Sequence, residues 1–531
     1  MHRWFLTSEE RGNDATELDR RHEGNVASSD GNLVRPVIHG ADYFRVLHEE
    51  LSALVAGDRV YFTDWRGDAD EMLLPGGPTV HELLCELASR GIEVRGLLWR
   101  SHSDHASFSA QANEKLGAEL NEAGAEVLFD QRVRRFGSHH QKMVIIRHKG
   151  AGERDVAFVG GIDLCHGRRD DATHAGDPQQ QPMDERYGDR AGWHDAAVEL
   201  RGPAVADVLE TFTERWDDPT PLDRRTPYRM LIQKKERMPR HPEPLPDLFP
   251  DPPSAGPHVV QLLRTYSSKR PRFPFAPEGE RSVARAYGKA FAQARSFIYV
   301  EDQYLWSEPV ARGIADALED HPQLQFIAVV PRFPDHDSKL TGPPNRIGQI
   351  RAMDVLKVAA PGRVGIFDLE NSGGTPIYVH AKVCIVDDVW FTIGSDNFNR
   401  RSWTSDSELT CAVIDPTRDS REPVDPAGRG DGARKLARDL RLTLWAEHLG
   451  RAAGDPAMLD PAAGLELWKQ TALALDLWHL YGRKGPRPPG QIRVHNPAQL
   501  TKFERLWAAP LYDHISDPDA RPRKLQKAGD F

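Results

Sequence analysis

Two short stretches of the sequence each carry a histidine and a lysine two residues apart, ahead of an apolar run. His140 and Lys142 precede MVII, and His380 and Lys382 precede VCIV. Residues two apart in an extended chain point to the same side, so each histidine projects together with its lysine. A histidine can attack phosphorus or donate a proton near neutral pH, and a lysine beside it supplies positive charge for phosphate oxygens. Two such pairs facing each other would perform in-line displacement at a phosphodiester without a metal ion.

The two stretches belong to an internal repeat. HHQKMVIIR followed by DVAFVGGIDLC aligns with VHAKVCIVD followed by DVWFTIGSDNF. Segments with helical spacing alternate with buried strands before each of them, and the same order restarts after a proline-rich segment. The pattern predicts an α/β fold of two similar α/β/α halves, each a mixed, mostly parallel sheet flanked by helices. We expect the halves to pack as a pseudo-twofold, bilobed catalytic domain.

Composition shifts along the chain suggest where these units begin and end. The segment RMPRHPEPLPDLFPDPPSAGP has too many prolines for regular structure, and LELWKQTALALDLWHLYG has the spacing of an amphipathic helix. The polar N-terminus shows little periodicity. The expected boundaries are a flexible arm over 1–36, a first half over 37–234, a linker over 235–257, a second half over 258–454 and a helical extension over 455–531.

Charge and cysteine content narrow the compartment and the partners. The 531 residues carry a formal net charge of −10, which gives no general attraction to nucleic-acid phosphates. The four cysteines form no CxxC pair, and free thiols fit a reducing cytoplasm. No run of about 18 apolar residues predicts a membrane-spanning helix, and the N-terminus has no apolar core of signal-peptide length. We therefore expect a cytoplasmic protein that contacts membranes peripherally at most.

Further segments extend the likeness to a known family. FVGGIDLC, WHDAAVELRGPAVADVLETFTERW, FIYVEDQYLW, IGSDNFNRRSW and DSEL resemble the phospholipase D superfamily, and specifically the catalytic core of its eukaryotic type, from about Val37 to Gly450. The resemblance implies a two-step reaction. His140 would attack phosphorus and form a phosphohistidine, while His380 would protonate the leaving alcohol and then activate water or another alcohol. Lys142 and Lys382 would hold the phosphate oxygens.

The resemblance also implies supporting residues. Asn397 matches the phosphate-contacting position of the family, and Asp163 is its counterpart in the first half. The Gly-led turns that contain them place Gly161 and Ser395 among the substrate-binding positions. Glu408 matches the carboxylate that orients a catalytic histidine, and Asp195 would do the same for the first half.

One position departs from the family's pattern. Asp387 completes the second motif, but Arg147 stands at the matching place in the first. Arg147 lies an odd number of residues from His140 and Lys142, so an unbroken strand would turn it away from them. The acid at this position should therefore support the backbone, and we expect activity to survive its replacement.

The leading interpretation is a phospholipase D that hydrolyses glycerophospholipids to phosphatidic acid and a headgroup alcohol, with transphosphatidylation to a competing alcohol. The alternatives are a phosphodiesterase or phosphatidyltransferase of the same fold acting on nucleic acid or in a cardiolipin-type transfer, and a catalytically impaired lipid-binding protein. The chemistry requires no cofactor, although activation by a divalent cation stays open. The expected partners are a phospholipid and a membrane surface, without nucleic acid, and the expected state is a monomer because one chain holds both motifs.

Two loops combine histidine and aspartate at close spacing. SHSDH at 101–105 and FPDHD at 333–337 have spacings that could bind a metal, but no further ligands follow in pattern. We expect solvated loops there and no metal site.

Overall fold

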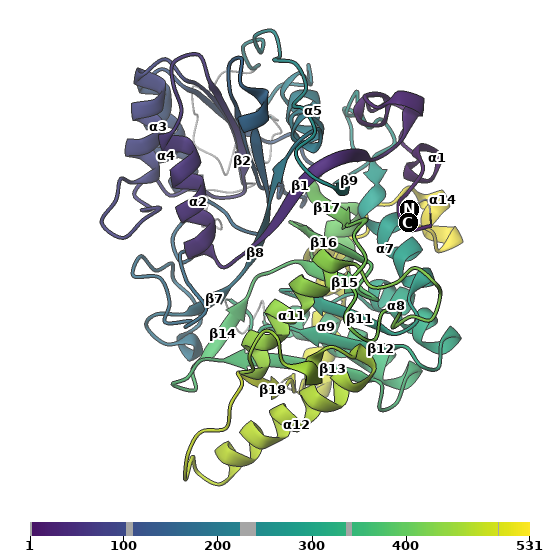
Figure 1. The fold of residues 1–531 in the computed structure, drawn as a ribbon. Coiled ribbons are helices and arrows are strands. Elements are labelled where there is room, and N and C mark those ends of the chain that lie inside the picture. Colours follow the sequence, from purple (N-terminus) through teal and green to yellow (C-terminus); the bar gives the residue numbers. More distant parts are fainter. Residues whose placement is uncertain (1–2, 102–109, 224–240, 336–341, 498) are drawn as a thin grey trace.

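The chain folds into two halves that lie one above the other, the first in purple and blue and the second in green (Figure 1). This computed structural model describes residues 3–101, 110–223, 241–335, 342–497 and 499–531.

The first half is built around one sheet with strand order β4-β3-β2-β5-β6-β8-β1. Helices occupy the connections between its strands, and a capping box of Thr79 and Glu82 begins the second of them. The elements are β1 (Ser29–Ile38), α2 (Gly40–Ser52), β2 (Arg59–Asp64), α3 (Val80–Ser89), β3 (Glu93–Trp99), α4 (Ala110–Glu122), β4 (Glu126–Asp130), β5 (Met143–Arg147), β6 (Val156–Gly160), β7 (Gly192–His194), β8 (Ala196–Arg201) and α5 (Ala204–Trp216).

The second half repeats this order as β13-β12-β11-β15-β16-β17-β9. Its elements are β9 (His258–Tyr266), β10 (Glu280–Arg281), α7 (Ser282–Gln293), β11 (Phe297–Glu301), α8 (Glu308–Asp320), β12 (Gln325–Val329), α9 (Gly342–Ala359), β13 (Val364–Glu370), β14 (Pro376–Val379), β15 (Val383–Val386), β16 (Trp390–Gly394), α10 (Arg400–Thr404), β17 (Glu408–Ile414) and α11 (Lys435–Leu449).

The expected mixed α/β fold of two similar halves is confirmed, but the parallel share of each sheet is smaller than the sequence suggested. In the first sheet β2–β3 and β3–β4 are parallel, whereas β2–β5, β5–β6, β6–β8 and β8–β1 are antiparallel. Helical connections link the parallel strands, while β5 and β6 join through a turn without a helix. Short turns favour antiparallel neighbours, so the strands next to the histidine motifs pair in that way.

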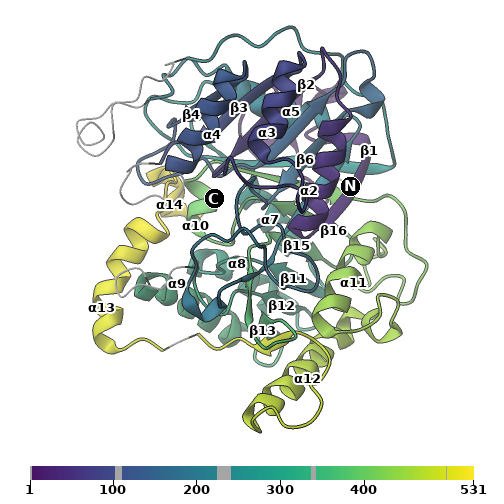
Figure 2. The same cartoon turned by 90° about the vertical axis from the view of Figure 1, so that its left-hand side faces the viewer.

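Three apolar cores hold these layers together. One lies between the first sheet and helices α2, α3 and α4, and a second lies between the second sheet and helices α7, α8 and α9. The third contains side chains from both sheets and from α5 and α11. Figure 2 shows the first half above the second, with α11 beside the second half. The two histidine motifs therefore meet where the halves are packed against each other.

The N-terminal segment corrects the expectation of a flexible arm over 1–36. Trp4, Phe5 and Leu6 are buried against the second half, and Arg11 is fully buried. Strand β1 pairs antiparallel with β8 and also bonds to β9, so it belongs to both sheets. Buried aromatic area and a paired arginine order a stretch that lacks helical or strand periodicity of its own.

The C-terminal segment adds the predicted helix α12 (Pro461–Leu480) and a strand that the sequence did not indicate, β18 (Ile492–Val494), which pairs with β13. Helices α13 (Lys502–Leu511) and α14 (Arg523–Ala528) follow. The proline-rich residues 241–257 form neither helix nor strand, and 224–240 lie outside the described residues. Within the described parts of the chain, no helix combines the length and apolar character that crossing a bilayer requires.

Candidate active site

The chain just before β5 and the chain just before β15 each bind the opposite half. The backbone N–H of His140 donates to the carbonyl of Ser407 at 2.9 Å, and that of His380 donates to the carbonyl of His194 at 2.8 Å. Ser407 precedes β17, and His194 precedes β8 by one residue. These two backbone hydrogen bonds place each histidine next to a strand of the other half.

Each histidine consequently faces a carboxylate from the opposite half. His140 Nδ1 lies 2.9 Å from Glu408 Oε2, and His380 Nδ1 lies 2.7 Å from Asp195 Oδ2. Both carboxylates are fully buried. The expectation that Asp195 serves the first half's histidine is wrong, because Asp195 follows His194, the residue that bonds to the second motif. With Nδ1 held in this way, Nε2 of each ring is the nitrogen left for chemistry.

Each of the two lysines lies against the backbone of the histidine in its own motif. Lys142 Nζ donates to the carbonyl of His140 at 3.1 Å and is 3.4 Å from Asp163 Oδ1. Lys382 Nζ donates to the carbonyl of His380 and lies 3.4 Å from Oε1 of Gln303. Both lysines are almost entirely buried, so their charges act on the histidines with little screening by water.

Strand register makes Asn397 the counterpart of Asp163, as the repeat suggested. Asp163 accepts weak bonds from the backbone N–H groups of Trp65 and Arg66, at 3.2 and 3.4 Å. Asn397 is 3% exposed, and its Oδ1 has no hydrogen-bond partner among the described residues.

Gly161 and Ser395 occupy matching places but support the carboxylates, which differs from the expected contact with substrate. A Cβ at Gly161 would lie 2.3 Å from Asp195 Oδ1, so only glycine leaves room for that carboxylate. Ser395 Oγ donates to Glu408 Oε2 at 2.6 Å. Gly161 of the first half thus leaves room for Asp195, whereas Ser395 of the second half holds the longer side chain of Glu408 with its hydroxyl group.

Burial and the lysines keep both histidines neutral. Burial, followed by the charges of Lys142 and Lys382, holds the pKa of His140 well below its usual value. Burial and Lys382 lower the pKa of His380 to about 3, although Asp195 opposes the shift. Burial also lowers the pKa of Lys382 to about 8. A neutral imidazole is the form that can attack phosphorus.

The two carboxylates differ in charge. Burial, followed by repulsion from Asp406, raises the pKa of Glu408 to about 8. Burial alone would also raise the pKa of Asp195, but the charge and hydrogen bond of His380 bring it below its ordinary value. At neutral pH His380 therefore has an ionised partner, and His140 has a protonated one.

Arg147 points away from the site, as strand parity predicted. Its Nε donates to Asp155 Oδ2 at 2.6 Å, and its guanidinium also donates to the carbonyl of Pro250 at 2.6 Å. The carboxylate of Asp387 binds backbone, and it accepts the N–H groups of Arg295, Ser296 and Phe297 at 2.8–2.9 Å. Both residues anchor the far end of a motif strand.

Three further residues complete the site, and two of them, Trp193 and Arg168, were not identified from the sequence. Trp193 packs its ring 5.0 Å from the His380 ring and donates to Asp195 at 3.2 Å. Arg168 lies 3.9 Å from Asp163 and stacks over Trp193 at 3.9 Å. Gln303 links Lys382 to the hydroxyl of Tyr378 at 2.7 Å. WHD, EDQY and the GR that follows FVGGIDLC contain these residues, but only the fold shows that they converge.

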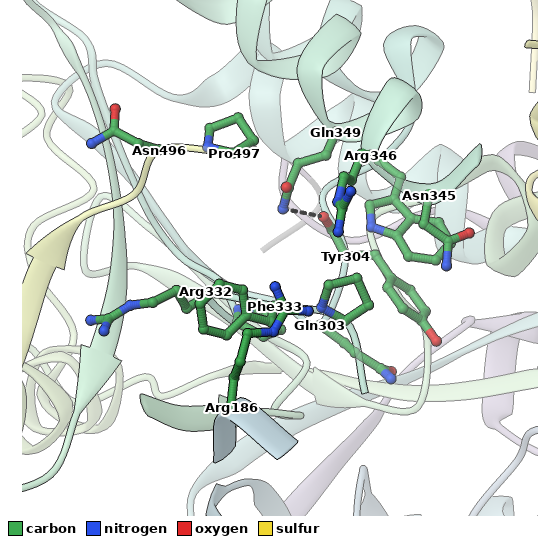
Figure 3. A pocket seen from close by; sticks show the side chains of 13 residues that line it. Arg186, Gln303, Tyr304, Arg332, Phe333, Asn345, Arg346, Gln349, Asn496 and Pro497 are labelled. Atoms are coloured by element: carbon green, nitrogen blue, oxygen red, sulfur yellow. Dashed lines mark hydrogen bonds between the residues drawn. The ribbon is translucent and has the colours of Figure 1, made fainter. Parts of the chain in front are cut away.

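Gln303 also lines a pocket of about 110 Å³ next to the lysine (Figure 3). Tyr304 and Phe333 contribute aromatic surface to it, while Arg332 and Arg346 contribute positive charge. Arg332 is paired with Asp368 at 2.7 Å. Of the two loops weighed as metal sites, residues 102–105 and 336–337 lie outside the described residues.

Comparisons with known proteins identify a family to which the chain is similar. The family model for phospholipase D matches residues 56–310 and 368–495. Phospholipase D alpha 2 of Oryza sativa subsp. japonica is 25% identical over 87% of this chain and 70% of its own length, and phospholipase D alpha 1 of Nicotiana tabacum is 26% identical over 89% and 71%. Phosphatidylserine synthase of Haemophilus influenzae Rd KW20 has a TM-score of 0.47 at 13% identity, covering 72% of this chain and 82% of its own.

The family match includes both histidine–lysine pairs and both carboxylates. The first matched segment contains His140, Lys142 and Asp195, and the second contains His380, Lys382 and Glu408. The two matched segments of the family model together contain the whole candidate site. The chain belongs to the phospholipase D family.

Proposed function

We propose that this protein is a phospholipase D that cleaves the distal phosphodiester of glycerophospholipids, giving phosphatidic acid and a headgroup alcohol. The observation that carries the proposal is the crossed pair of histidines, each bonded through Nδ1 to a buried carboxylate of the opposite half. The plant relatives, which bear the name phospholipase D, support the choice of substrate.

The unequal carboxylates support a division of labour between the histidines. His140 Nε2 attacks phosphorus, a P–N bond forms, and the P–O bond to the headgroup breaks. His380 takes up a proton when the anionic phosphodiester binds beside it, because a nearby negative charge favours the imidazolium, and ionised Asp195 stabilises that form. The proton then passes from His380 to the leaving oxygen. Water, deprotonated by His380, then attacks phosphorus and releases His140. A primary alcohol in place of water gives a phosphatidyl-alcohol.

The remaining residues hold the phosphate. Lys142 and Lys382 neutralise its non-bridging oxygens, and the amide of Asn397 contacts one of them. The neighbouring pocket, with its aromatic and guanidinium groups, accommodates the glycerophosphate or the headgroup. The substrate enters from a membrane surface on which the protein sits peripherally, and one chain suffices because it contains both motifs.

Product analysis on lipid vesicles tests the proposal. The full chain is incubated with phosphatidylcholine and phosphatidylethanolamine vesicles, and phosphatidic acid is measured by mass spectrometry. Added 1-butanol is expected to divert product to phosphatidylbutanol. His140→Asn and His380→Asn should each lose at least about 10³-fold in turnover, because a covalent and a general acid–base step depend on them.

The matched control is His81→Asn, which changes a partly exposed histidine of α3 and should leave turnover unchanged. Failure of the folded chain to release phosphatidic acid from any lipid, or full activity in His140→Asn, would contradict the proposal.

A further inference from the structure

A second group of histidines lies behind the active site and takes no part in the chemistry above. His39 sits between β1 and α2, His174 lies in the segment between β6 and β7, and His194 ends β7. Their rings approach one another edge-on, with centroids 5.1–5.7 Å apart. Glu447, from α11 of the other half, reaches into the space between them.

The carboxylate of Glu447 is the centre of this group. His39 Nε2 lies 2.8 Å from its Oε2, while His174 Nε2 and His194 Nδ1 lie 3.0 and 3.6 Å from its Oε1. One ligand atom from each of the four residues falls within 4.8 Å of all the others. Ligand atoms of a tetrahedral zinc ion, at about 2.0 Å from the metal, lie roughly 3.3 Å apart. The four atoms are thus already gathered at nearly the spacing that such an ion requires.

The outer nitrogens of two rings have the partners expected of metal ligands. His194 Nε2 lies 2.8 Å from Oε2 of Glu301, and Glu301 is itself held by the hydroxyl of Tyr299 and by His448. His174 Nδ1 lies 3.2 Å from the carbonyl of Trp193. A metal-bound imidazole usually donates its second N–H to a carboxylate or a carbonyl, which fixes the ring and directs the other nitrogen inward. Both rings are arranged in this way.

Two histidine nitrogens of this cluster lack hydrogen-bond partners. His194 Nδ1 and His39 Nδ1 are buried without a hydrogen-bond partner among the described residues. His39 also has a φ of +71°, a conformation that costs a non-glycine residue about 1–3 kcal/mol. An ion bound by His194 Nδ1 would pair that nitrogen and compensate the strain at His39.

We propose that His39, His174, His194 and Glu447 form a structural binding site for a divalent transition-metal ion of the zinc class. Three imidazoles and one carboxylate suit such an ion better than calcium or magnesium, which prefer oxygen ligands. The three histidines are almost fully buried, so the four ligands close the site, as in structural zinc sites. Glu447, 13% exposed, offers the route by which the ion enters.

The position of the site gives it a role in holding the active site. The carbonyl of His194 accepts the backbone N–H of His380, and Asp195, the next residue, holds that ring. An ion on His194 would tie β7 to α11 and to the start of α2. His194 is then a positioning residue whose metal bond keeps the two halves in register at His380.

Metal content of the purified full chain tests the proposal directly. Elemental analysis from manganese to zinc is expected to find about one equivalent per chain after incubation with Zn²⁺ and desalting. Cobalt added to chelator-treated protein should produce the visible absorption bands of a four-coordinate ion. Zinc should also raise Tm, since an ion that binds only the native state stabilises it.

Variants assign the ion to these ligands. Glu447→Gln and His174→Asn should lose the bound metal and the cobalt spectrum, whereas His479→Asn should keep both. His479 forms a similar pair with Glu370, at 2.7 Å, outside the cluster. If a cluster variant fails to fold, the cobalt titration of the unaltered chain still decides. Metal at trace level and a featureless cobalt spectrum would overturn the proposal, as would a full equivalent retained by folded Glu447→Gln. The metal assays need no lipid substrate, so their outcome does not depend on the proposed phospholipase D activity.

Discussion

His140 and His380, the two histidines of the candidate site, have carboxylate partners that differ in charge. Asp195 reaches His380 with a short side chain and is ionised, whereas Glu408 reaches His140 from a position where burial and Asp406 raise its pKa to about 8. A charged partner stabilises an imidazolium, and a neutral partner only fixes the orientation of the ring. The repeat is therefore symmetric in position and asymmetric in charge.

Amide substitutions separate these two roles. We expect Asp195→Asn to lower kcat by about 10²–10⁴-fold, because it removes the charge that stabilises protonated His380. Glu408→Gln should lower kcat by no more than about 10-fold, because it keeps an oxygen opposite His140 Nδ1 without changing the charge at neutral pH. Steady-state rates of both variants at pH 7 measure the difference. Equal losses in the two variants would show that the carboxylates act alike.

Lys382 sets an expected upper pH limit for activity. Its pKa is about 8, so its positive charge is complete below that pH and is lost as the pH rises through it. We expect kcat/KM to fall on the alkaline side with an apparent pKa near 8, since this parameter reports the free enzyme. In Lys382→Arg, whatever activity is left should persist to higher pH, because guanidinium does not titrate in this range. An alkaline limb that stays in place in the arginine variant would rule out Lys382 as its source.

Residue spacing explains why the histidines and lysines could be identified from the sequence. Parity along a strand fixes which side chains share a face, and that argument placed Arg147 correctly. The parity of positions along one strand does not show which strand of the other half faces that strand. The pairing of Asp195 with His380 depends on the backbone bond from His380 to His194, 186 residues away in sequence, and such contacts have no local signal.

At the scale of elements, the turn after each motif strand explains the departure at Arg147. Asp387 and Asp388 both have positive φ and form a tight turn between β15 and β16, where Asp387 accepts three backbone N–H groups. The turn between β5 and β6 runs from 148 to 155. Asp155 now accepts the N–H of His148, and Arg147 neutralises it. In the alignment of the two halves Asp155 matches Asp388, so Arg147 pairs with an acid that both halves have at this place.

Restoring the family's residue should consequently be harmful. Arg147→Asp would place a second carboxylate beside buried Asp155 and remove the bond to Pro250. We expect the free energy of unfolding to fall by about 3–5 kcal/mol, as when a buried ion pair is broken, with no gain in turnover. Thermal unfolding and initial rates measure the two effects. Arg154→Asp, on the exposed part of the same turn, is the control and should change little. A faster and equally stable Arg147→Asp enzyme would mean that the site is impaired as it stands.

Strands with a continuous apolar run were predicted from the sequence, whereas strands that depend on pairing with a neighbouring strand were not. The apolar runs DRVYFTDW, IEVRGLLW and AEVLFD correspond to β2, β3 and β4. By contrast β1 and β18 are edge or bridging strands with several exposed positions, so their sequences lack a continuous apolar run. Pairing with β8 and β13 orders them, and a single segment does not contain that information.

At the scale of the whole molecule, the N-terminal segment joins the two halves. Strand β1 bonds to β8 of the first sheet and to β9 of the second, and the chain before it lies on the second half. Arg11 is the main polar anchor. Its guanidinium lies 2.8 Å from Asp19 and 2.9 Å from Glu280, and it donates to the carbonyl of Leu262 at 2.9 Å. The interface that forms the active site therefore includes residues from outside the repeat.

Removing this anchor should weaken the whole molecule, because Glu280 and Asp19 would stay buried with fewer cations. We expect Arg11→Ala to lower the free energy of unfolding by about 3–5 kcal/mol, measured by chemical denaturation. Arg20→Ala is the matched control. That side chain is 52% exposed, pairs with the exposed carboxylate of Glu17 and donates to the carbonyl of Asp14, so its loss should cost no more than about 1 kcal/mol. Because β1 spans both sheets, the Arg11 variant should unfold in one transition whose midpoint is the same for tryptophans of either half. Unchanged stability in Arg11→Ala would mean that the segment lies on the second half without stabilising it.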